Sequence, residues 1–63
     1  MRLFKSALRK RIEAKILELE ANVDCMINEQ IAHLEYKDLE KYCALSVRIA
    51  DTKAKIKLLE ELL

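Results

Sequence analysis

Large apolar residues recur every three or four positions from residue 4 to residue 34. Steps of three and four place side chains on one stripe of an α-helix, because the helix turns once every 3.6 residues. The members of this stripe are Phe4, Leu8, Ile12, Ile16, Leu19, Val23, Met26, Ile27, Ile31 and Leu34. The pattern therefore predicts one long amphipathic helix over residues 2–34.

The side of this helix opposite the apolar stripe carries small residues, namely Ala7, Ala14, Ala21, Cys25 and Ala32. One interpretation is that alanine is simply the best helix former on an exposed face. The other is a close-packed contact with a further helix. The sequence favours the first interpretation and leaves the second open.

From residue 39 onward the apolar spacing becomes a heptad repeat, which is typical of helices packed side by side. One heptad position holds Tyr42, Ile49, Ile56 and Leu63, and the position three later holds Leu45, Thr52 and Leu59. Thr52 is the polar member of this seam. It is either a tolerated residue that bonds back to its own helix or a polar layer that sets the register. The repeat predicts a second helix over residues 39–62.

Charged residues interrupt the apolar pattern at residues 35–38, where we expect a turn. Asp38 is a suitable N-cap, because its carboxylate can accept the free N–H groups of a helix that begins at Leu39. The chain contains no Gly and no Pro. This composition disfavours hairpin-rich β folds and glycine-rich phosphate loops. It also means that the turn has no glycine with which to end the first helix.

These elements predict an all-α, single-domain chain over residues 1–63: a two-helix antiparallel hairpin that dimerises into a four-helix bundle. The alternative is one continuous helix in a parallel coiled coil. For a compact chain of this size, burial of apolar surface stabilises the fold by roughly 95 kcal/mol, which only balances a conformational ordering cost of roughly 95 kcal/mol. We therefore expect that folding requires association with a second copy of the chain. The expected core and dimer residues are Leu8, Ile12, Leu19, Val23, Ile27, Leu34, Leu45, Ile49, Ile56 and Leu59.

The charge pattern is basic through residue 15, acidic over residues 16–40 and mildly basic afterwards, with a net charge of +1. In a hairpin, lysines 53, 55 and 57 are expected to approach Glu18 and Glu20 and to form charge pairs between the helices. The basic N-terminal segment offers a second function, contact with nucleic acid or another anionic surface. Its candidate residues are Arg2, Lys5, Arg9, Lys10 and Arg11. Nucleic-acid binding through these residues is an alternative function, which the sequence does not favour. Membrane binding is not expected.

Catalytic and metal-binding patterns are not found in the sequence. His33 lies eight residues from Cys25 and ten from Cys43, which is not the spacing that brings ligands together on one helix face. A single histidine with few hydroxyl residues does not make a nucleophilic site. We therefore expect no enzyme, no metal and no cofactor. Two cysteines without a disulfide pattern or secretory leader favour free thiols in the cytoplasm.

The whole chain, from MRLFKSALRKR to AKIKLLEELL, resembles the small accessory early proteins of lambdoid phages in length, composition and helical content. It is also similar in expected architecture to plasmid-encoded helical-hairpin regulators. The phage resemblance implies a regulatory protein of the host cytoplasm that acts on the host or on a developmental choice by binding another molecule. The function expected from the sequence is therefore a non-enzymatic regulatory or protein-interaction module, acting as a homodimer and binding a further protein.

Overall fold

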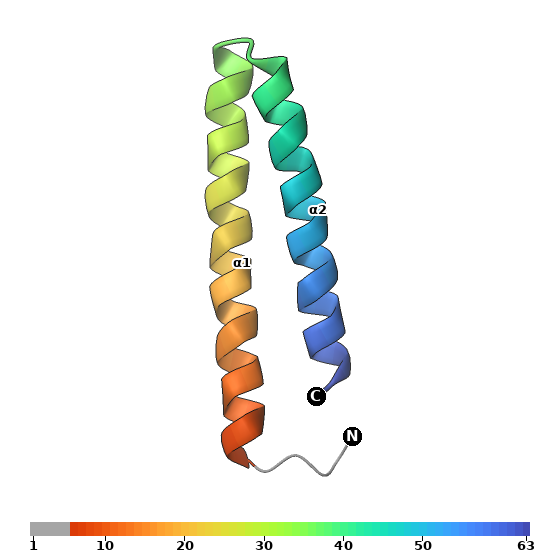
Figure 1. The fold of residues 1–63 in the computed structure, drawn as a ribbon. Helices are drawn as coiled ribbons and strands as arrows, with labels where there is room; N and C mark the ends of the chain where they lie inside the picture. Colours follow the sequence, from red (N-terminus) through yellow and green to blue (C-terminus); the bar gives the residue numbers. More distant parts are fainter. Residues whose placement is uncertain (1–5) are drawn as a thin grey trace.

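Two antiparallel helices make up the fold, as the computed structural model shows for residues 6–63 (Figure 1). Helix α1 runs over Ser6–Glu35 and helix α2 over Leu39–Glu61. The two helices pack against each other along their length, so the hairpin prediction is confirmed and the chain is not one unbroken helix. The bounds lie within one residue of those expected at residues 34, 39 and 62. The start expected at residue 2 lies outside the described residues.

The turn between the helices is built around Lys37, which adopts a left-handed backbone conformation with φ of 59°. The Lys37 N–H donates to the carbonyl of Leu34 at 3.1 Å, and the Asp38 N–H donates to the carbonyl of His33 at 2.8 Å. These two bonds are those of a Schellman motif, in which glycine normally occupies the left-handed position. The chain therefore ends α1 without glycine, at a conformational cost to Lys37 of about 1–2 kcal/mol.

Asp38 both completes the end of α1 and begins α2. Its side chain accepts a hydrogen bond from the Lys41 N–H at 3.3 Å, which is the N-cap arrangement predicted from the sequence. The Lys41 ammonium also lies 3.9 Å from the same carboxylate. The two helix ends thus share one residue, and the connection needs only residues 36–38.

Helix α2 turns its heptad positions toward α1. Leu45 and Ile49 are buried, and the other members of the heptad seam are partly buried. The Thr52 hydroxyl donates to the Arg48 carbonyl at 2.8 Å, so the interpretation in which threonine bonds back to its own helix is confirmed. Leu45 and Ile49 join Val23 and Met26 of α1 in the one buried cluster that the described residues form.

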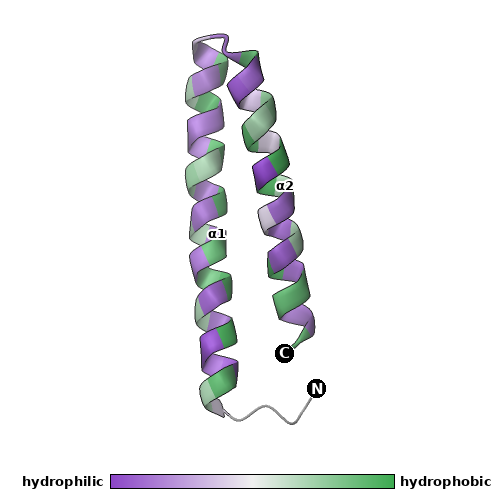
Figure 2. Cartoon of the chain, in the orientation of Figure 1, coloured by the Kyte–Doolittle hydropathy of each residue, from purple (hydrophilic) through white to green (hydrophobic). Residues whose placement is uncertain are grey.

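Helix α1 meets α2 along a line that departs from its apolar stripe. Ile12, Ile16, Val23 and Met26 are buried on this line. Nearer the turn, the partly buried residues are Gln30 and His33. Ile27, Ile31 and Leu34 belong to the apolar stripe but are exposed. Figure 2 shows hydrophobic and hydrophilic residues alternating along both helices.

The hairpin is elongated. Its Cα radius of gyration is 14.9 Å, against about 11 Å for a compact domain of 63 residues. Its shortest principal extent is 8 Å, which is the thickness of a single layer of helices. A single layer has two broad sides, and each helix faces a neighbour in only one direction.

Candidate functional site

The residues expected to form the core and dimer fall into three groups by burial. Ile12, Val23, Leu45 and Ile49 are buried, and Leu19, Ile56 and Leu59 are partly buried between the helices. The remaining three are exposed in the single chain: Leu8, Ile27 and Leu34. One hairpin therefore leaves three of the ten expected core residues exposed to solvent.

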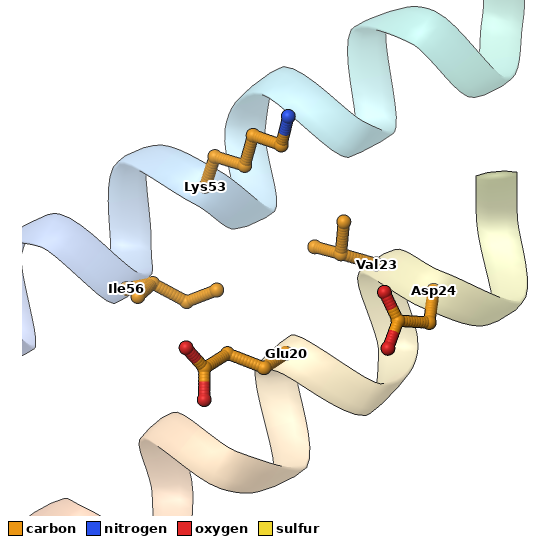
Figure 3. A pocket seen from close by; sticks show the side chains of 5 residues that line it. All are labelled: Glu20, Val23, Asp24, Lys53 and Ile56. Carbon is orange, nitrogen blue, oxygen red and sulfur yellow. The ribbon is translucent and has the colours of Figure 1, made fainter.

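One broad side of the hairpin, here called the groove face, is defined by Glu20, Asp24 and Lys53. These three side chains surround a groove whose floor is formed by Val23 and Ile56 (Figure 3). Glu20 and Asp24 come from α1, and Lys53 comes from α2. The groove thus shows which stripe of each helix belongs to the same side of the molecule.

The groove face continues toward the turn through residues at helical spacing. On α1, Ile27 and Leu34 lie seven and fourteen residues after Glu20, and Ile31 lies seven after Asp24. Residues seven apart share one face of a helix, so these positions extend the groove face and make it apolar. Ile31 and Leu34 are each 53% exposed.

The same spacing applies on α2. Ser46 and Leu39 lie seven and fourteen residues before Lys53, and Leu39 is exposed. The groove face therefore carries charged groups of opposite sign on its two helices near mid-length. Close to the turn it carries an apolar patch, which consists of Ile27, Ile31, Leu34 and Leu39.

The other broad side of the hairpin is polar between mid-length and the turn. Its hollows there are lined on α1 by Asn22, Glu29 and His33, and on α2 by Lys41 and Arg48. Toward the open end this side is partly apolar, since Leu58 and Leu59 line a further hollow there. Near the turn, an apolar partner surface therefore fits the groove face better than the opposite one.

The charge pairs expected between helices are not formed, and this prediction is wrong for residues 6–63. Each ion pair found there joins residues only three or four positions apart in the sequence. The pairs are Arg9–Glu13 at 4.0 Å, Lys15–Glu18 at 3.1 Å, and Lys41–Asp38 at 3.9 Å. Glu18 is paired within its own helix by Lys15. Glu20 shares the groove with Lys53, but the two side chains extend away from each other (Figure 3).

The polar link between the helices comes instead from Gln30, which the sequence reasoning missed. The Gln30 amide donates to the Tyr42 carbonyl at 3.0 Å and to the Ser46 hydroxyl at 2.6 Å. The sequence did contain a signal for this role, because Gln30 has apolar residues within four positions before and after it. A polar residue so close to the helix contact line needs a hydrogen-bond partner. Gln30 therefore ties α1 to the first half of α2.

The basic residues proposed for an anionic partner are only partly described. Arg2 and Lys5 lie outside the described residues. Arg9 is 4.0 Å from Glu13, so its charge is partly compensated. Lys10 and Arg11 are exposed on the first turns of α1. Within the described part of the chain, the basic cluster is thus small and flanked by an acid.

Residues 6–63 contain no group of three or more His, Cys, Asp and Glu side chains placed to hold a metal ion. Cys25 and Cys43 are free and exposed, and they lie on different helices. Neither α1 nor α2 is long and apolar enough to cross a membrane.

Comparison of the chain with protein-family models, with curated proteins and with solved structures finds no match.

Proposed function

We propose that this protein is a non-enzymatic interaction module that works as a helical homodimer and presents rigid helix faces to a further protein. The observation that carries the proposal is the incomplete core of the single hairpin. Among the described residues, six hydrophobic side chains are buried and none is less than 2% exposed. A second copy of the same chain can bury the exposed apolar side chains without a different partner protein.

The exposed area supports the same proposal. The chain exposes 5218 Å², whereas a compact monomer of 7.4 kDa exposes about 4,200 Å². The excess of about 1,000 Å² is close to the roughly 800 Å² that each partner loses in an interface of standard size. Dimerisation of the hairpin into a four-helix bundle would therefore bring the surface of each chain to the normal range.

The regulatory part of the proposal rests on shape and on the resemblance to phage accessory early proteins. The connection between the helices is three residues long, too short to build a catalytic loop. Recognition by a helix face needs only apolar and charged side chains at helical spacing, which both helices provide. We propose that such a face binds a protein of the host cytoplasm.

The test of the homodimer is to measure association and helicity together over a dilution series. Sedimentation velocity should report a dimer at micromolar concentration, and circular dichroism at 222 nm should lose helical signal as the dimer dissociates. Leu19→Asp places a charge on the helix contact line and should abolish dimer and fold together. Val47→Asp is the matched control, since Val47 is 62% exposed on the outer side of α2.

A folded, monomeric Leu19→Asp variant would contradict the coupling between folding and association. A wild-type chain that stays folded and monomeric at high concentration would refute the homodimer itself.

A further inference from the structure

The groove face carries an apolar patch near the turn and, beside it, charges of opposite sign. Together these two features indicate which surface of a partner can bind there. We propose that the groove face is the dimer interface. In this dimer, the turns of the two hairpins lie at the same end, and α1 of each copy packs against α2 of the other. This inference rests on the proposed homodimer and specifies its surface and its orientation.

The groove face carries the apolar side chains that a second copy would cover. Ile27, Ile31, Leu34 and Leu39 give the groove face large apolar side chains that the hairpin leaves exposed. Both sides also carry charges: Glu20, Asp24 and Lys53 line the groove face, and the opposite side carries Glu29, Lys41 and Arg48. The apolar patch is therefore what distinguishes the groove face, and a second copy of the chain that covers this face buries the patch.

The apolar patch is also complementary to itself. A two-fold axis brings the same patch of both copies together, so the patch must match itself. The apolar patch spans both helices, because Ile31 and Leu34 belong to α1 and Leu39 begins α2. When the turns lie at the same end, the patches of the two copies cover each other, with Ile31 and Leu34 of one copy over Leu39 of the other.

The charges of the groove face favour one orientation. With the turns at the same end, Glu20 and Asp24 on α1 face Lys53 on α2 of the other copy, so opposite charges meet near mid-length. Only at the open end do like charges meet in this orientation, where Glu13 faces Glu60. With the turns at opposite ends, each helix meets its own counterpart. Glu20 and Asp24 would then meet the same acids of the second copy, and Lys53 would meet Lys53. Like charges brought together across an interface disfavour association.

The absence of an ion pair between Glu20 and Lys53 within the hairpin fits this arrangement. Both side chains line the groove, yet no pair within 4.0 Å joins α1 to α2 among residues 6–63. A second copy can therefore form ion pairs with the carboxylates of Glu20 and Asp24 and with the ammonium of Lys53 (Figure 3). The groove floor of Val23 and Ile56 would be covered by the same contact.

The surface is tested with one charged substitution on each side of the molecule. Ile31→Glu places two charges in the proposed interface of each dimer and should raise the dimer dissociation constant at least ~100-fold. Val47→Glu makes the same change at similar exposure on the outer side of α2 and should leave the constant within about threefold. Val47 lies two residues from both Leu45 and Ile49, which places it on the far side of α2 from α1.

A charge exchange keeps the test independent of folding defects. One variant carries Glu20→Lys and Asp24→Lys, and a second carries Lys53→Glu. Each alone should associate at least ~10-fold more weakly than the wild type, and an equimolar mixture should form a heterodimer of near wild-type affinity. A mixture that does not associate would overturn the proposed facing of α1 and α2.

The orientation is tested by a distance between spin labels at the two turns. Tyr36 is 83% exposed, so Tyr36→Cys in a background with Cys25→Ser and Cys43→Ser gives one labelled site per chain. With the turns together, the labels should lie within about 30 Å, since packed helices are only about 10 Å apart. With the turns opposed, the labels would be separated by about 45 Å, the length of α1.

The possible failures are distinguishable. A wild-type chain that is monomeric overturns both the proposed function and this inference. A wild-type dimer in which Ile31→Glu changes nothing overturns the groove-face interface alone. A dimer disrupted by Ile31→Glu with labels about 45 Å apart overturns the orientation alone.

Discussion

Lys37 gives the most direct test of the turn, because its left-handed backbone is unfavourable for any residue with a Cβ. We expect Lys37→Gly to stabilise the protein. Its φ of 59° falls in the region that glycine enters without steric cost, and the Lys37 N–H bond to the Leu34 carbonyl is kept in the variant.

The magnitude follows from two opposing terms. Removing Cβ relieves about 1–2 kcal/mol of left-handed strain. Glycine gives the unfolded chain more freedom and so costs about 0.5–1 kcal/mol. The net stabilisation is therefore about 0.5–1 kcal/mol per chain. For an unfolding slope near 1 kcal/mol per molar, the urea midpoint should rise by about 0.5–1 M.

The assay is urea unfolding followed by circular dichroism at 222 nm, with all variants at one protein concentration because association contributes to stability. Lys37→Ala is the control, since it removes the same charge as Lys37→Gly and retains Cβ. We expect the alanine variant to lie within about 0.5 kcal/mol of the wild type. A glycine variant no more stable than the alanine variant would refute the left-handed conformation at residue 37.

Three further predictions concern contacts at the turn, between the helices and at the start of α1. Asp38→Ala should destabilise the chain by about 1 kcal/mol, whereas Asp38→Ser should retain most of the stability, because serine also caps helices; urea midpoints distinguish the two variants. A double-mutant cycle between Gln30→Ala and Ser46→Ala should give a coupling of about 0.5–1 kcal/mol, and additivity within error would mean that their 2.6 Å hydrogen bond contributes nothing. Alanine replacement of residues 9–11 should leave dimer affinity unchanged. Neither wild type nor variant should be retained on duplex DNA at about 150 mM salt, and salt-dependent retention of the wild type alone would favour the nucleic-acid alternative.

Local sequence chemistry was sufficient to predict the helices and the turn between them. The three-and-four spacing from residue 4 to residue 34 and the heptads after residue 39 depend only on helix geometry. Asp38 was identifiable as the N-cap because a carboxylate at that position has a local partner. The left-handed state of Lys37 could not be read in the same way, because lysine has no preference for it and the Schellman bonds determine it.

The groove face was not predictable from the sequence. The apolar stripe of α1 is wider than about 100°, so one neighbouring helix covers only part of it, and the sequence does not say which part. The sequence placed Ile27 and Leu34 in the core together with Val23. The turn sets where α2 lies beside α1, and that position covers Val23 and Met26 while leaving Ile27 and Leu34 exposed.

The sequence by itself therefore determined the two helices to within one residue at the described bounds, a turn at residues 35–38 and the heptad seam of α2, since each depends on contacts within a few residues. Only the tertiary structure decided that Gln30 occupies the helix contact near the turn and that the oppositely charged Glu20 and Lys53 share one groove without pairing. The physical reason is that helical periodicity fixes the angle of a side chain about its own axis, whereas burial depends on where the second helix lies.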